Sequence, residues 1–144
     1  MTDIPWSCFS ECKNLETITL GNGVQSIGNS AFNNCSKLET INFAVDSHLT
    51  FIDGYAFYNC GLKSVTLPNS VTTLGETIFS WCRQLKEVTF GSAITSIPFY
   101  SFTGCQALKS LYIPAGVVSM GGFFEYCCEQ MEDVYCSADP ATMY

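Results

Sequence analysis

A segment of about 23 residues repeats along the chain, and this repetition constrains the fold more than any other feature. The unit that starts at Leu15 has the pattern Leu-x-x-Ile-x-Leu, through Ile18 and Leu20, and a Phe and a Cys follow at fixed places. Further units start at Leu38, Leu62, Leu85 and Leu108, and an incomplete one at Met131. Such a period predicts a solenoid, in which each unit buries its apolar face only against its neighbours.

The repeats predict one domain over the whole chain, residues 1–144. Its units are a partial repeat at 1–14, complete repeats at 15–37, 38–61, 62–84, 85–107 and 108–130, and a partial repeat at 131–144. The chain begins and ends within a unit, whereas solenoids need polar terminal caps. We therefore expect the chain to be a piece of a longer protein or a short relative of one.

Each unit carries two signals for extended structure. The last positions of Leu-x-x-Ile-x-Leu alternate as in a half-buried strand, and Gly or Pro follows at once, as at Gly21 and Pro68. A second apolar pair, such as Val24 and Ile27, predicts a shorter extended piece. The stretch around each Phe is expected to form one or two helical turns. The predicted fold is a stack of coils with a parallel β-sheet on one face and turns, helical turns and short strands on the other.

Two further columns of residues predict the core. The phenylalanines should stack from coil to coil, and they are Phe9, Phe32, Phe57, Phe79 and Phe102. Six of the nine cysteines hold one place in the repeat, namely Cys12, Cys35, Cys60, Cys82, Cys105 and Cys128. We expect buried free thiols there, although the distance between coils does not exclude disulfides. Only Cys127 falls outside the apolar pattern, and one of Cys127 and Cys128 should be exposed.

Composition and motifs disfavour several classes of function. Charged residues make up 13% of the chain and the net charge is −7, which argues against nucleic acid and anionic membranes as partners. No apolar run is long enough to insert into a membrane, and no signal peptide is visible. The only histidine, His48, lies in a predicted surface loop near Asp46, and no phosphate-binding loop is present. We expect no catalytic residue, no metal site and no cofactor.

The repeats resemble the BspA-like leucine-rich repeat. The resemblance rests on Leu-Lys-Ser-Val-Thr-Leu-Pro at 62–68, on Ile-Gly-Asn-Ser-Ala-Phe-Asn-Asn-Cys at 27–35 and on Ser-Phe-Thr-Gly-Cys at 101–105, and it extends from about Ile4 to Cys136. It implies a right-handed, curved leucine-rich-repeat solenoid from a bacterial or protozoan surface or secreted protein that adheres to host proteins, matrix or other cells. The last coil departs from the pattern, with Glu125 at the place of the Phe.

Partners are expected on residues that the repeat leaves variable. The main candidate is the outward face of the longer strands, formed by Glu16, Thr19, Glu39, Asn42, Lys63, Thr66, Lys86, Thr89, Lys109 and Tyr112. Its three lysines predict a local basic stripe that attracts an acidic protein partner. A second candidate is an aromatic patch near the Phe column, formed by Tyr55, Tyr58, Trp81, Phe99 and Tyr100. The alternatives are a structural spacer and, least favoured, an enzyme; the oligomeric state stays open.

Overall fold

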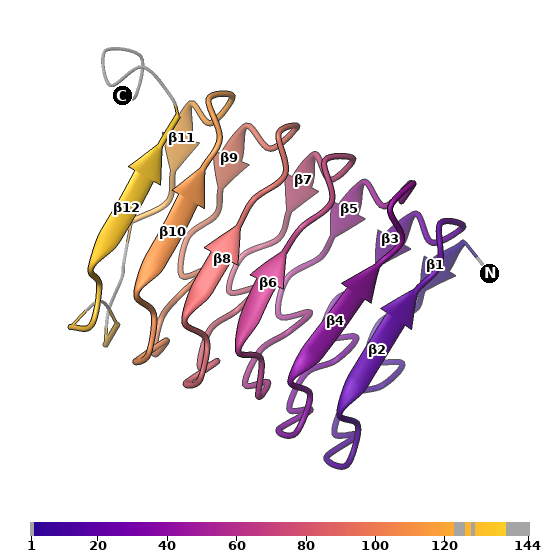
Figure 1. Ribbon diagram of the computed structural model, residues 1–144. Coiled ribbons are helices and arrows are strands. Elements are labelled where there is room, and N and C mark those ends of the chain that lie inside the picture. The colour runs from indigo at the N-terminus through magenta and orange to yellow at the C-terminus, as the bar shows by residue number, and fades with distance from the viewer. Residues whose placement is uncertain (1, 123–125, 128, 138–144) are drawn as a thin grey trace.

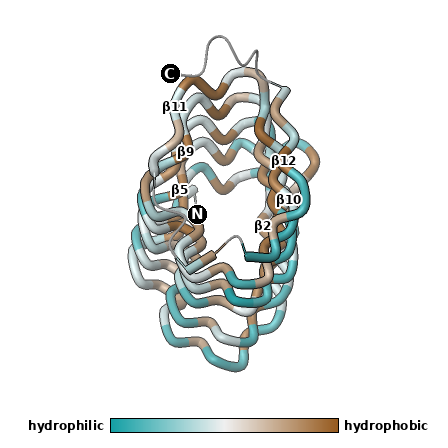
Figure 2. The backbone as a smooth tube through the Cα atoms, turned by 90° about the vertical axis from the view of Figure 1, so that its left-hand side faces the viewer, coloured by the Kyte–Doolittle hydropathy of each residue, from teal (hydrophilic) through white to brown (hydrophobic). Residues whose placement is uncertain are grey.

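The chain winds into a solenoid in which every coil contributes one longer and one shorter strand (Figure 1). The computed structural model describes residues 2–122, 126, 127 and 129–137. Viewed along the stack, the two kinds of strand form layers on opposite sides of each coil (Figure 2). The predicted solenoid with parallel strands is therefore confirmed.

The longer strands form the face that carries the candidate residues. They are β2 (Thr17–Leu20), β4 (Thr40–Phe43), β6 (Ser64–Thr66), β8 (Glu87–Thr89), β10 (Ser110–Ile113) and β12 (Asp133–Cys136). The shorter strands are β1 (Asp3–Ile4), β3 (Ser26–Ile27), β5 (Phe51–Ile52), β7 (Thr73–Leu74), β9 (Ser96–Ile97) and β11 (Ser119–Met120). All pairs are parallel and keep the repeat register, as Ile18 opposite Ile41 and Val65 opposite Val88 show.

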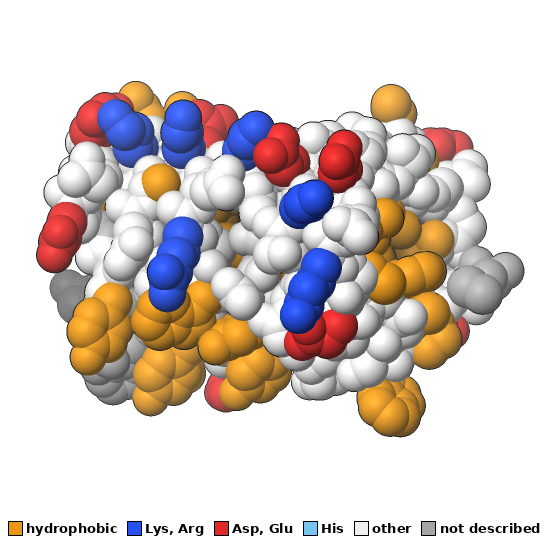
Figure 3. Space-filling model, turned by 90° about the horizontal axis from the view of Figure 1, so that it is seen from below, with side chains coloured by type: hydrophobic (Ala, Val, Ile, Leu, Met, Phe, Trp, Pro, Cys, Tyr) orange, Lys and Arg blue, Asp and Glu red, His pale blue; other side chains and the backbone are white. Residues whose placement is uncertain are grey.

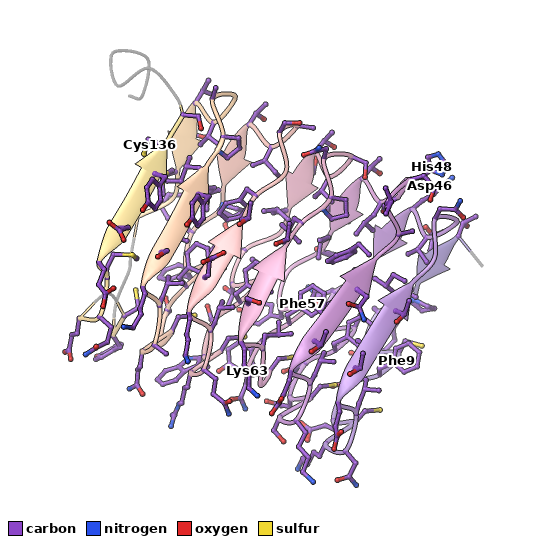
Figure 4. All side chains as sticks on the ribbon, viewed as in Figure 1. Phe9, Asp46, His48, Phe57, Lys63 and Cys136 are labelled. Atoms are coloured by element: carbon purple, nitrogen blue, oxygen red, sulfur yellow. The ribbon has the colours of Figure 1, made fainter. Side chains whose placement is uncertain are left out.

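The predicted phenylalanine column is the centre of the core. Phe32, Phe57 and Phe79 are almost wholly buried. Along the column, from Phe9 to Phe102, successive ring centroids lie 5.3, 5.5, 5.8 and 6.1 Å apart, and the planes are within 14° of parallel. The column thus joins the coils through stacked rings, with Phe9 at its more exposed end (Figure 4).

The expected helical turns around each Phe are wrong, because the described residues contain no helix. In the five coils from Ser7 to Gly104, two residues of each coil adopt a left-handed backbone and interrupt any helix, such as Ser30 (φ 56°) and Asn34 (φ 59°) on either side of Phe32. Every second amide of this stretch donates to the next coil, as the Phe32 amide does to the Ala56 carbonyl at 2.9 Å. The amides between them close tight turns within their own coil, as the Ala31 amide does to the Gly28 carbonyl at 3.1 Å. Bonds that alternate between the next coil and the same coil thus replace the regular bonds that a helix would make.

The repeated cysteines close the coils as buried free thiols, as predicted. Four of these thiols each donate a hydrogen bond to the carbonyl of the phenylalanine in the preceding coil. The bonds are Cys35 to Phe9 at 3.1 Å, Cys60 to Phe32 at 3.0 Å, Cys82 to Phe57 at 3.1 Å and Cys105 to Phe79 at 3.1 Å. Cys12 is exposed because it belongs to the first coil, where no preceding coil covers it.

The assignment of the last two neighbouring cysteines is corrected. Cys127, placed outside the pattern by its sequence position, is buried. It follows Tyr126 (φ 56°) as Cys105 follows Gly104 (φ 74°), so Cys127 takes the repeated position. Cys128 and Glu125 lie outside the described residues. The last coil therefore reaches its Cys one residue early.

The sheet of longer strands is interrupted between β4 and β6, and this break divides the candidate face. Hydrogen bonding joins β2 to β4 and, separately, β6 to β8, β10 and β12. Two differences in loop and turn length between coils cause this break. The loop at 44–48 is longer than its counterpart at 21–23, and Gly61 alone separates Cys60 from Leu62, whereas two residues separate Cys82 from Leu85. The strand spacing therefore shifts at this one junction (Figure 1).

Candidate interaction face

The main candidate surface is the outward face of the longer strands, which we call the strand face. Its side chains come from the outward positions of these strands and from the residues just before them. The structure brings the ten predicted residues together as two groups. Glu16, Thr19, Glu39 and Asn42 lie at the β2–β4 sheet, and Lys63, Thr66, Lys86, Thr89, Lys109 and Tyr112 lie at the larger sheet. The alternation of side chains along each strand is enough to position them, because a residue between two buried positions of a strand points to solvent.

Ion pairs between coils reduce the predicted basic stripe. Lys63 Nζ lies 2.6 Å from Glu39 Oε2, and Lys109 Nζ lies 2.8 Å from Glu132 Oε1. Among the described residues, the structure gives Lys86 no ion pair, so it is the one uncompensated cation of the three. Exposed pairs of this kind stabilise by about 0–1 kcal/mol, and they mainly fix side-chain positions. Figure 3 shows acidic and basic side chains side by side along one margin of the molecule.

A polar groove lies at the break in the sheet. Its volume is about 390 Å³, and it is lined by Glu39, Thr40, Ile41, Asn42, Phe43, Ser64 and Thr66. The Glu39–Lys63 ion pair spans the break at one end. A second hollow of about 340 Å³ adjoins it at Phe43 and Thr66, and its lining includes Ser70, whose buried hydroxyl oxygen has no hydrogen-bond partner. The groove can therefore offer polar side chains and strand-edge backbone groups to a partner.

Sequence reasoning missed this groove, although the signal was present. The loop at 44–48 carries extra residues and the turn at Gly61 is short. A Cβ at position 61 would lie 2.5 Å from the Ser36 carbonyl oxygen, so only glycine fits this turn without a shift. Unequal lengths on the two sides of one coil are the feature that could have predicted the break.

Tyrosines form the other end of the strand face. The rings of Tyr112 and Tyr135 stack with centroids 4.7 Å apart and planes 5° from parallel. Partial burial and the nearby carboxylate of Glu87 raise the pKa of Tyr112. Tyr135, which continues the outward column of Tyr112 by one coil, remains 49% exposed. This end offers aromatic surface, whereas the centre of the face is polar.

His48 and Asp46 lie in the exposed loop predicted for them (Figure 4). Both contact Asn22 of the preceding coil, through His48 Nδ1 at 3.1 Å from the Asn22 carbonyl oxygen and through Asn22 Nδ2, which donates to Asp46 at 2.8 Å. The latter bond lowers the pKa of Asp46. The two side chains thus attach the longer loop to its neighbour.

The described part of the chain has no group of three or more His, Cys, Asp or Glu residues arranged to hold a metal ion. In the same residues, no helix has the length and apolarity needed to cross a membrane.

The stacked coils, the parallel ladders and the buried Phe and Cys columns define a leucine-rich-repeat solenoid. Residues 2–132 match the family model of the BspA type leucine rich repeat region in six copies. The chain therefore belongs to this family, as its motifs predicted. No match was found among curated proteins.

Solved bacterial structures share the fold. A leucine-rich repeat protein of T. pallidum is 25% identical, with a TM-score of 0.75 over 85% of this chain and 64% of its own. The pneumococcal vaccine antigen PcpA is 24% identical, with a TM-score of 0.84 over 99% of this chain and 37% of its own. A leucine-rich cell surface protein of Faecalibacterium prausnitzii is 24% identical, with a TM-score of 0.67 over 94% and 45%. The chain thus spans less than two thirds of the length of each.

Proposed function

We propose that this protein is a non-catalytic protein-interaction and adhesion module of a cell-surface or secreted protein, and that it binds through the strand face. The observation that carries the proposal is the difference between the inward and the outward positions of each longer strand. Inward positions repeat Leu, Ile and Val, whereas the outward positions differ from coil to coil among acidic, basic, polar and aromatic residues. Solenoids use such extended faces to bind partners.

The partner proposed is a protein of the host, of the matrix or of another cell surface. The net charge of −7 disfavours nucleic acid. Lys86 supplies an unpaired positive charge in the middle of the face, and the groove beside Thr66 and Asn42 supplies polar groups. The surface location is supported by family membership and by the similarity to a protein described as a cell surface protein.

Two charge-reversal variants test this face. The first changes Lys63, Lys86 and Lys109 to Glu, and the second changes the only other basic residues, Lys13, Lys37 and Arg83, to Glu. Both alter the net charge equally, so they separate a local effect from a global one. Binding to immobilised extracellular matrix and to cultured cells is measured by surface plasmon resonance and by flow cytometry.

The first variant should weaken binding about tenfold or more, which corresponds to about 1.4 kcal/mol, while the second should bind nearly as the unmodified protein does. Equal binding by all three proteins would reject the strand face. Absence of binding by the unmodified protein would instead favour the spacer role.

A further inference from the structure

Four aromatic residues on the turn side of the solenoid occupy backbone positions that disfavour them, namely Tyr126 of the last coil and one residue in each of three successive coils before it. Each of the five coils from Ser7 to Gly104 has two left-handed positions around its Phe. In successive coils, the first is held by Ser7, Ser30, Tyr55, Thr77 and Tyr100, and the second by Glu11, Asn34, Asn59, Trp81 and Gly104. Large side chains rarely adopt such a conformation, whereas Asn and Gly tolerate it. Tyr55 (φ 58°), Trp81 (φ 64°) and Tyr100 (φ 59°) are therefore poor choices for the fold alone.

These three residues converge on one hollow. It has a volume of about 290 Å³, and its wall contains Tyr55, Trp81 and Tyr100 together with Tyr58 and the hydroxyl-bearing Thr77. The described residues that line it carry aromatic rings or hydroxyl groups and no formal charge. Tyr55 and Tyr100 are 45% and 41% exposed, so much of their surface faces solvent. The left-handed backbone itself recurs from coil to coil, so what distinguishes this hollow is that three of its left-handed positions carry aromatic rings. Costly residue choices that gather at one place point to function.

The indole of Trp81 is held in place by its neighbours. A Cβ at position 104 would lie 2.8 Å from Cδ2 and Cε3 of Trp81, so the ring packs directly on the glycine backbone of the next coil. The guanidinium carbon of Arg83 lies 5.2 Å from the ring centroid. The rings of Tyr55 and Tyr58 meet at 52° with centroids 5.8 Å apart. The wall is thus ordered before any ligand arrives, which reduces the entropy lost on binding.

We propose that this hollow, which we name the aromatic pocket, binds an uncharged saccharide. The C–H face of a sugar ring packs on exposed aromatic rings, and its hydroxyls pair with phenol and Thr hydroxyls, which both donate and accept hydrogen bonds. The residues that line the hollow carry no formal charge, which matches an uncharged ligand, and the Arg83 guanidinium beside them is held at the indole of Trp81. Figure 3 shows hydrophobic side chains gathered along the margin opposite the charged one. The proposal does not depend on the strand face.

The repeat itself suggests a variant that removes the three aromatic side chains and uses only residue types that the fold already contains at these positions. Changing Tyr55→Ser, Trp81→Asn and Tyr100→Thr places at each position a residue type that another coil already carries there, as at Ser30, Asn59 and Thr77. We expect this variant to unfold at a midpoint no lower than that of the unmodified protein. The Lys63, Lys86 and Lys109 to Glu variant serves as the binding control, because its changes lie on the other face.

The probe is an array of neutral and acidic oligosaccharides, followed by titration calorimetry with each retained neutral oligosaccharide. The unmodified protein and the strand-face variant should bind the same neutral glycans, and the aromatic variant should bind them at least tenfold more weakly. Retention of no neutral glycan, or equal binding by the aromatic variant, would overturn the proposal. If the aromatic variant loses stability, the single changes Tyr55→Ser and Tyr100→Thr provide the same comparison, and undiminished binding by both would overturn it too.

Discussion

The stacked phenylalanines allow a quantitative test of how the coils hold together. Phe57 is wholly buried, and its ring lies 5.5 Å from that of Phe32 and 5.8 Å from that of Phe79. Truncation to Ala removes a large apolar side chain and both ring contacts, so Phe57→Ala should lower the free energy of unfolding by about 3–5 kcal/mol. Phe9 is 40% exposed and stacks on Phe32 alone. Phe9→Ala should therefore cost only about 1–2 kcal/mol.

Urea denaturation followed by far-UV circular dichroism measures both values. Phe57→Leu is the matched control, because it keeps most of the volume and should cost less than about 1.5 kcal/mol. The reasoning fails if Phe9→Ala and Phe57→Ala destabilise equally, since the column would then not transmit packing between coils. It fails as well if Phe57→Ala costs less than Phe57→Leu.

Two further predictions concern the thiols and the close approach of coils. Burial raises the pKa of Cys35 to about 11 and that of Cys82 to about 12. Thiols of the unfolded chain ionise near pH 8.5, so the free energy of unfolding should fall from about pH 8.5 towards pH 12, by at most about 1.4 kcal/mol per pH unit for each thiol. Chemical denaturation in the presence of a reductant, repeated across this pH range, measures the fall. A free energy of unfolding that does not change with pH would contradict the prediction. Gly91→Ala should destabilise by about 1–3 kcal/mol, because its Cβ would overlap the Pro68 carbonyl, whereas Gly21→Ala, with open space around it, should change stability by less than about 0.5 kcal/mol in the same assay.

The core was predictable because the sequence repeats it in register. Every strand position that recurs as Leu, Ile or Val, and every recurring Phe, has the same neighbours one coil away. A single coil would be ambiguous, since the spacing of Val24 and Ile27 fits a strand or a turn. Six copies remove the ambiguity, because only a stack of equivalent coils buries all of them at once.

The turn side was less predictable because its structure comes from bonds between coils. The helical turns expected around Phe32 assumed that all hydrogen bonds lie within the segment, yet every second amide bonds to the next coil. Bulky residues such as Trp81 and Tyr100 also carry no sequence signal for a left-handed backbone. The sequence pattern assigns the repeated cysteine position to Cys128 instead of Cys127 for a similar reason. Counting residues back from Met131 does not reveal that the length of the turn before it has changed.

The break between β4 and β6 shows how length differences shape the strand face without weakening the core. On the turn side the same two coils remain joined, because β5 pairs with β7 and Phe57 stacks on Phe79 at 5.8 Å. The coils therefore part only on the side of the longer strands, where the polar groove opens. A partner that spans both parts of the face must accommodate this groove. The short-strand ladder from β1 to β7 runs across the same junction and keeps the two parts from separating. The extra residues at 44–48 and the single Gly61 therefore determine the shape of the proposed binding surface as much as its outward side chains do.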